Sequence, residues 1–196
     1  MKKVIDHFER RMMAGNVISK DETAVVRYGL EVFFISFLEL AAIFVLAAFV
    51  GNLASTVCFF LAFIPLRLFA GGFHASTRLR CFVLSLSVYC VFTVIMQMIP
   101  TSWYTKLVYG LLLVTGYIIW RFSPSIHRNR RSNEYDRQFY HRISLKIWFF
   151  ESIMIAVFQA LLPISTVGIA LTLGMFSEAL ALLVVVLDKY MSSVCQ

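Results

Sequence analysis

Long apolar stretches separated by short polar or charged segments dominate this chain. Six stretches share this character, and they cover residues 24–50, 53–70, 81–99, 104–122, 144–163 and 165–187. A helix needs about 20 predominantly apolar residues to cross a bilayer. The pattern therefore predicts an all-α integral membrane protein with about six transmembrane helices, built as a single membrane-embedded domain over residues 1–196.

Two of the six stretches have special features. The second contains Pro65 and ends at Arg67, and its uninterrupted apolar core covers only Val57–Leu66. A proline removes one backbone hydrogen bond of a helix, so a kinked or a re-entrant helix is the alternative to a full span here. The last two stretches are separated only by residues 163–166, which predicts a tight antiparallel hairpin.

The positive charges predict the orientation. If the N-terminus is cytoplasmic and six helices cross, 17 of the 18 Lys and Arg residues lie on the cytoplasmic side and only Lys106 lies outside. Cytoplasmic loops of membrane proteins carry such an excess of Lys and Arg. Both termini are therefore expected to be cytoplasmic, together with residues 67–81 and a basic loop over residues 121–146.

The N-terminal segment, residues 1–23, mixes charged residues with apolar ones at helical spacing. The apolar positions are Val4, Ile5, Phe8 and Met12. This pattern predicts an amphipathic helix on the membrane surface, and a solvated tail is the alternative.

Composition agrees with a membrane protein. Hydrophobic residues make up 60% of the chain and the mean hydropathy is +0.78, whereas soluble domains are about 45–50% apolar. The net charge of +7 comes from the basic loops. In a membrane chain, topology and anionic lipids explain such a charge better than nucleic acid does, and an acidic peptide is a further candidate partner.

The segment RLFAGGFHASTRLRC, residues 67–81, carries the candidate chemistry. It places His74 seven residues before Cys81, and a neighbouring imidazole can convert a cysteine thiol into the reactive thiolate. Seven residues of a continuous helix rise about 10.5 Å, which is too far for a hydrogen bond of about 3 Å. A catalytic pair therefore requires a turn between the two residues. The alternative is a boundary histidine and a packed cysteine.

The local sequence permits that turn. Gly71 and Gly72 can adopt conformations that are closed to other residues, and a serine and a threonine precede Arg78 as good N-cap residues. Cys81 would then lie in the first turn or so of a helix that begins near Arg78, where the helix dipole and the Arg78 charge favour a thiolate.

The pattern Arg67-x-x-x-Gly71-Gly72-x-His74, followed by Cys81, resembles the signature of the accessory gene regulator B (AgrB) family. These proteins are bacterial membrane cysteine endopeptidases that process the precursors of cyclic quorum-sensing peptides. The resemblance extends to chain length, the basic N-terminus, the apolar spans and the arginine-rich loop. It implies that His74 and Cys81 are the catalytic pair, at the cytoplasmic face of the bacterial cell membrane.

The resemblance also implies the reaction and the partners. The substrate is an AgrD-like propeptide with an acidic C-terminal tail, and the membrane lipids surround the enzyme. His74 takes the proton of Cys81, the thiolate displaces the tail, and the resulting thioester is transferred within the peptide to form a thiolactone or lactone. A homodimer is plausible, whereas no cofactor, metal or nucleic acid is implied.

Further residues are candidates for supporting roles. Glu31 lies nearest the cytoplasmic end among the intramembrane acids and could orient His74, with an ion pair to Arg27 or Arg67 as the alternative. Arg67 is a candidate for binding the acidic tail or an oxyanion, or it simply ends the second helix as a snorkelling side chain. The backbone N–H groups of Gly71 and Gly72 are also oxyanion candidates.

The loop over residues 121–146 contains the densest run of basic residues. The run is either a signal that sets the membrane topology or a surface that contacts an acidic propeptide. The run includes Arg128, Arg130 and Arg131.

A multi-span peptide transporter without protease activity is the main alternative function. The chain shows no convincing internal repeat, no nucleotide-binding motif and no HExxH metal site. A membrane scaffold that recruits acidic partners is a second alternative. Neither explains why a histidine and a cysteine occur together in a segment rich in glycine and arginine.

Overall fold

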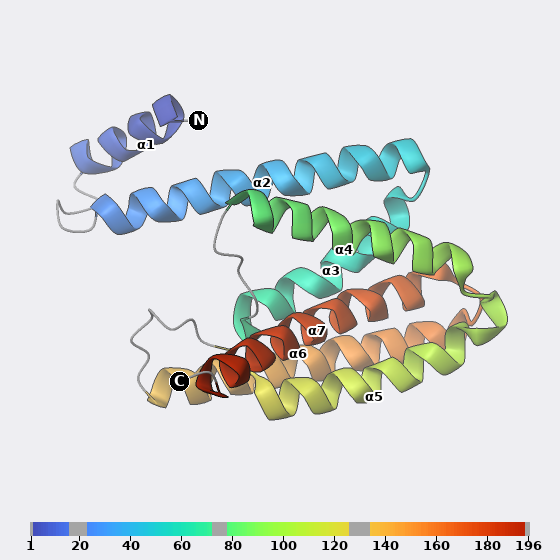
Figure 1. The fold of residues 1–196 in the computed structure, drawn as a ribbon. Coiled ribbons are helices and arrows are strands. Elements are labelled where there is room, and N and C mark those ends of the chain that lie inside the picture. Colours follow the sequence, from blue (N-terminus) through green and yellow to red (C-terminus); the bar gives the residue numbers. More distant parts are fainter. Residues whose placement is uncertain (1, 16–22, 72–77, 126–133, 195–196) are drawn as a thin grey trace.

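The computed structural model describes residues 2–15, 23–71, 78–125 and 134–194 (Figure 1). Within these ranges, the side chains of residues 2, 3, 78–81, 189, 190 and 192–194 lie outside the description. The described chain is helical, and the elements are α1 (Lys2–Ala14), α2 (Thr23–Val50), α3 (Leu53–Ala70), α4 (Arg78–Met98), the 3-10 helix η1 (Thr101–Trp103), α5 (Tyr104–Phe122), α6 (Glu134–Leu161) and α7 (Thr166–Val194).

The helical class and the positions of the six apolar helices are confirmed. Each predicted apolar stretch forms one of the helices α2 to α7, and the last two form the expected hairpin, with α6 ending at Leu161 and α7 beginning at Thr166. The second stretch is a continuous helix in spite of Pro65. A proline is tolerated in an apolar helix when the surroundings satisfy the freed backbone carbonyl.

Four helices are long and apolar enough to cross a membrane, namely α2, α3, α6 and α7. The helices α4 and α5 reach this limit only as a pair, which is bent by 101° at the break between them. Length and composition thus support four spans, or five if the bent pair counts as one. The break has a local cause, since Pro100 lies between the two helices in extended conformation and cannot continue a helix hydrogen-bond ladder.

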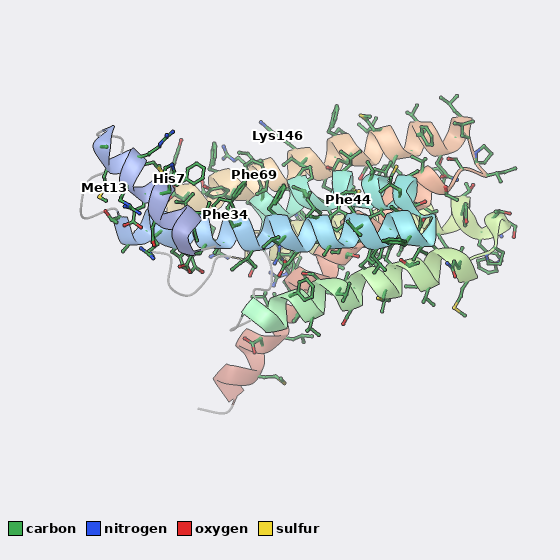
Figure 2. The ribbon with its side chains drawn as sticks, turned by 90° about the horizontal axis from the view of Figure 1, so that it is seen from above. His7, Met13, Phe34, Phe44, Phe69 and Lys146 are labelled. Carbon is green, nitrogen blue, oxygen red and sulfur yellow. The ribbon has the colours of Figure 1, made fainter. Side chains whose placement is uncertain are left out.

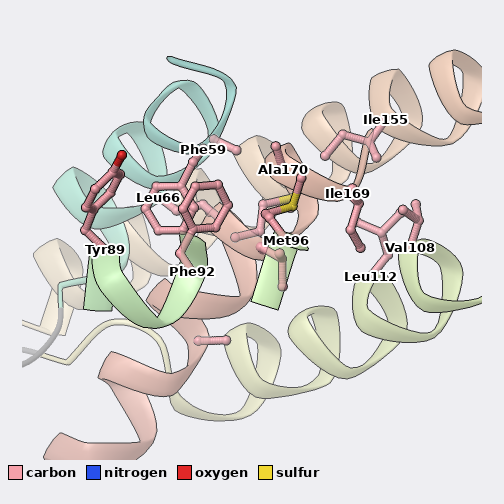
Figure 3. Packing of buried hydrophobic residues seen from close by; sticks show 14 of the residues in the cluster. Phe59, Leu66, Tyr89, Phe92, Met96, Val108, Leu112, Ile155, Ile169 and Ala170 are labelled. Atoms are coloured by element: carbon pink, nitrogen blue, oxygen red, sulfur yellow. The ribbon is translucent and has the colours of Figure 1, made fainter. Parts of the chain in front are cut away.

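The helix α7 lies at the centre of the bundle, packed most extensively against α3 and α5, with α6 beside it (Figure 1). Aromatic contacts join α3 to α4, where the Phe59 and Phe92 ring centroids are 4.6 Å apart (Figure 3). At the other end of the same core, α5, α6 and α7 bury aliphatic side chains such as Val108, Ile155 and Ile169. This apolar core fixes the helices whose ends carry the candidate site.

The N-terminal segment forms α1 over Lys2–Ala14, and this helix packs against the start of α2 (Figure 2). Ile5 is buried, and the Phe8 and Phe34 ring centroids are 6.1 Å apart. The helix in this segment is therefore confirmed, and its place on a membrane surface stays a prediction.

The ends of several helices gather on one side of the bundle. On the left of Figure 1 lie the start of α2, the end of α3, the starts of α4 and α6, and the ends of α5 and α7. The short turns that join α2 to α3, α4 to α5 and α6 to α7 lie on the opposite side. The described helix ends that flank the segments predicted to share one membrane face thus lie at one end of the bundle.

Candidate functional site

The structure places the predicted site residues in three groups. His74, Gly72 and the arginines at 128, 130 and 131 lie outside the described residues. For Cys81 and Arg78 the backbone is described, but the side chains are not. The surroundings of Arg67, Gly71 and Glu31 are described in full.

Cys81 lies in α4, which is described from Arg78 onward. The predicted start of this helix near Arg78 stays a prediction, because the residues before Arg78 lie outside the described ranges. The preceding helix, α3, ends at Ala70, and the segment that contains His74 connects the two helices.

Arg67 lies in the last turn of α3 and pairs with an acid from a distant part of the sequence. Its Nη1 is 3.4 Å from Oε2 of Glu178 on α7, and the Glu178 side chain is fully buried. The same Nη1 donates to the Gly71 carbonyl oxygen at 3.3 Å. Arg67 thus links α7 to the end of α3, where the segment with the predicted catalytic histidine begins. The sequence shows Glu178 as an acid within an apolar stretch and gives no indication of its partner.

Gly71 has a conformation and a contact that require glycine. Its φ is +82° and its ψ is −149°, a region that residues with a side chain essentially do not populate. A Cβ at this position would overlap the Ser125 carbonyl oxygen and lie 3.2 Å from the Ser125 carbonyl carbon. Gly71 thus adopts a conformation that only glycine adopts readily, and its role as an oxyanion donor stays a prediction.

The contact with Ser125 forms a short parallel bridge between two chain segments. The Ser125 N–H donates to the Ala70 carbonyl oxygen at 2.9 Å, and Gly71 and Ser125 form an isolated β-bridge. The last carbonyls of a helix have no partner within the helix, so this bond satisfies one of them at the end of α3. The segment that follows α5 thereby holds the end of α3.

Residues from α6 complete this arrangement. The Nδ1 atom of His141 is 2.7 Å from the Ser123 carbonyl oxygen. One residue earlier, the Tyr140 ring lies against the Phe69 ring of α3, with centroids 6.4 Å apart. The sequence did not indicate a role for His141, because the residues around it give no sign of a contact with Ser123.

Glu31 has a described partner in Arg27. Arg27 Nε lies 4.0 Å from Glu31 Oε1, one helical turn away on α2. Arg27 is also held by α1, with Nη2 2.8 Å from Asp6 Oδ1 and Nη1 2.9 Å from Glu9 Oε2. The ion pair with Arg27, expected as the alternative role of Glu31, is present. Orientation of His74 by Glu31 stays a prediction, since His74 is outside the described residues.

Within the described part of the chain, no group of three or more His, Cys, Asp or Glu side chains could hold a metal ion. The described arrangement is a frame of helix ends. It holds the last residue of α3, from which the chain continues toward His74.

Comparison with known proteins adds the family. The model of the family described as accessory gene regulator B matches residues 1–187. An AgrB-like protein of Listeria monocytogenes serotype 4b is 30% identical over 121 residues, which are 58% of this chain and 58% of the relative. AgrB-like proteins of Listeria innocua serovar 6a and Listeria welshimeri serovar 6b match over the same shares at 30% and 27% identity.

The match thus covers less than two thirds of the length of these relatives. No solved structure matches the chain. The family model covers nearly the whole sequence, including the segment from Arg67 to Cys81. The chain therefore belongs to the accessory gene regulator B (AgrB) family.

Proposed function

We propose that this protein is a membrane cysteine endopeptidase that processes a quorum-sensing propeptide. It removes the acidic C-terminal tail of an AgrD-like propeptide and allows the remaining peptide to close into a thiolactone or lactone. The observation that carries the proposal is the family match over residues 1–187, which includes the Gly71-Gly72-x-His74 pattern and Cys81. The sequence also supports it, because Ser76 and Thr77 are good N-cap residues for a helix that would place Cys81 near its N-terminus, where a thiolate is stabilised.

The first chemical step is acylation of Cys81. His74 takes the proton of the Cys81 thiol, and the thiolate attacks the carbonyl carbon at the end of the signal region of the propeptide. The tetrahedral intermediate collapses when His74 donates the proton to the departing amine. The products are the free acidic tail and a thioester between Cys81 and the shortened peptide.

The second step closes the ring. A cysteine thiol or serine hydroxyl within the bound peptide attacks the thioester and releases Cys81. Exchange of one thioester for another is nearly neutral in free energy, so the energy of the acyl bond is retained only if water does not hydrolyse it first. A site at the edge of the membrane restricts water, and binding holds the internal nucleophile close to the acyl carbon.

Substrate recognition is assigned to the basic side chains on the same face. The arginines at 128, 130 and 131 are proposed to contact the acidic tail through charge-assisted hydrogen bonds. Arg67 already contacts Glu178 and the Gly71 carbonyl. Those contacts favour a role for Arg67 in shaping the loop over a role as the sole receptor for the tail.

The proposed topology has six crossings, with α4 and α5 each crossing once and both termini in the cytoplasm. The support comes from the positive charges, of which all but Lys106 then lie on one side. The gathering of the corresponding helix ends at one end of the bundle is consistent with it.

The test uses native-like membranes that contain the full chain and a propeptide from the same gene neighbourhood. Cleavage is followed by mass spectrometry for wild type, His74→Ala and Cys81→Ala, and the protein is searched for an acyl adduct on Cys81. Cys58→Ser and Cys90→Ser are the matched controls, since these free cysteines lie in the apolar helices α3 and α4.

Cleavage and the adduct are expected in wild type and in both control variants, and both are expected to be absent from His74→Ala and Cys81→Ala. Cleavage that persists in Cys81→Ala would exclude the proposed nucleophile. Peptide export that is unaffected by Cys81→Ser, without cleavage in wild type, would support the transporter alternative instead.

A further inference from the structure

His141 is the eighth residue of α6 and contacts the residue that follows α5, while its neighbour Tyr140 contacts the end of α3. Its Nδ1 is 2.7 Å from the Ser123 carbonyl oxygen. A carbonyl oxygen can only accept a hydrogen bond, so Nδ1 carries the proton and donates it. The ring is thereby fixed in one tautomer and one orientation.

The Ser123 carbonyl needs such a donor. Ser123 is the residue that ends α5, and its own N–H still donates to the Ile119 carbonyl at 3.0 Å. Its backbone is extended, with φ −80° and ψ 148°, so its carbonyl has left the direction of the helix. Ser123 is only 8% exposed. A buried carbonyl without a partner is costly, and His141 supplies the bond.

Two residues further on, the same segment holds the end of α3. The Ser125 N–H donates to the Ala70 carbonyl oxygen at 2.9 Å. Gly71 lies so close to Ser125 that it has no room for a side chain. The position of residues 123–125 therefore determines where Gly71 lies, and His74 follows Gly71 by three residues.

A second contact between the same helices supports this coupling. Tyr140 on α6 contacts Phe69 on α3, and their rings are inclined by 37°. Tyr140 directly precedes His141, and Phe69 directly precedes Ala70. The contact between their rings therefore helps to keep α6 in place beside α3.

We propose that His141 is a positioning residue for the catalytic segment. It fixes residues 123–125, these fix Ala70 and Gly71, and the start of the segment that carries His74 is placed as a result. This inference rests on the proposed function, because it treats His74 as the catalytic base. His141 itself takes no part in the bond changes and needs no contact with the substrate.

The experiment compares four proteins in membranes, namely wild type, His141→Ala, His141→Asn and His141→Gln. The amide nitrogen of asparagine lies near the position of Nδ1 and can donate to the Ser123 carbonyl, whereas that of glutamine lies near the position of Nε2. His7→Ala is the matched histidine control, because His7 lies on α1 and contacts the Phe8 ring. Propeptide cleavage gives kcat and KM, and amide hydrogen exchange reports on residues 67–71 and 123–125.

His141→Ala is expected to lower kcat by up to about 100-fold, the loss that a displacement of about 1 Å can cause, with little change in KM. It is also expected to accelerate exchange of the Ser125 amide. His141→Asn should restore most of kcat and of the protection, and His141→Gln should restore neither. His7→Ala should behave as wild type.

Three results would overturn the inference. One is a wild-type kcat in a folded His141→Ala protein, and another is an equal loss in the Asn and Gln variants. The third is unchanged exchange at Ser125 in the Ala variant, which can be measured whether or not the propeptide is cleaved. If His141→Ala does not fold, the Asn and Gln variants still decide. Failure of wild type to cleave any propeptide would instead reject the proposed function.

Discussion

Arg67 on α3 and Glu178 on α7 form an ion pair, with Arg67 Nη1 3.4 Å from Glu178 Oε2, although 111 positions separate them in the sequence. The Glu178 side chain is fully buried, and its Oε1 atom has no hydrogen-bond partner among the described residues. The pair lies next to the last turn of α3 and extends through Arg67 to the Gly71 carbonyl. It therefore joins the central helix of the bundle to the start of the proposed catalytic segment.

Removal of one member of this pair is expected to be destabilising. Glu178→Ala removes the buried acid that pairs with Arg67, and loss of one partner of a buried pair costs about 3 kcal/mol. The measurement is the thermal unfolding midpoint in nanodiscs. A double-mutant cycle with Arg67→Ala is the control, since the double variant should be less destabilised than the sum of the single variants. Additive effects would contradict a direct interaction.

Gly71→Ala is expected to impair both the loop and cleavage. The added methyl group meets Ser125, and the conformation at φ +82° is costly for alanine, by about 1–3 kcal/mol. Cleavage should fall by at least about tenfold, because the segment with His74 is displaced. Gly110→Ala on α5 is the matched control, since a Cβ there meets nothing within 4 Å. Equal cleavage by the two variants would show that Gly71 does not determine the loop position.

The helices α2 to α7 could be predicted from the sequence because each corresponds to one long apolar run with a polar or glycine-containing boundary. The contacts Arg67–Glu178 and His141–Ser123 could not be predicted from the sequence. They depend on which helices pack side by side, and the sequence of an apolar stretch does not indicate which other helix it contacts. The break between α4 and α5 had a local signal in Pro100, but its angle depends on packing.

The attachment of α1 to α2 is expected to depend on Arg27. The bonds from Arg27 to Asp6 and Glu9 join the two helices, and Arg27 and Asp6 are about 40% exposed, so solvent screening keeps the contribution of each bond small. Arg27→Ala should accelerate amide hydrogen exchange in residues 4–14, and high salt should weaken the attachment in wild type. Arg10→Ala is the control, because Arg10 donates to the Asp6 carbonyl within its own helix. Unchanged exchange in Arg27→Ala would mean that Ile5 and Phe8 hold α1 by packing alone.

The approach of α7 to α3 is expected to tolerate no side chain at Gly174. A Cβ there would overlap the Phe59 carbonyl oxygen and lie 3.0 Å from its carbonyl carbon, which is backbone and cannot rotate away. Small residues allow membrane helices to pack closely, and overpacking costs about 1–3 kcal/mol. Gly174→Ala should therefore lower the thermal midpoint, whereas Gly29→Ala should not, since nothing lies within 4 Å of a Cβ at that position of α2. Because the Arg67–Glu178 pair joins the same two helices, Gly174→Ala should also reduce cleavage. A destabilised variant that keeps full activity would show that the close packing of α3 and α7 does not determine the position of the loop.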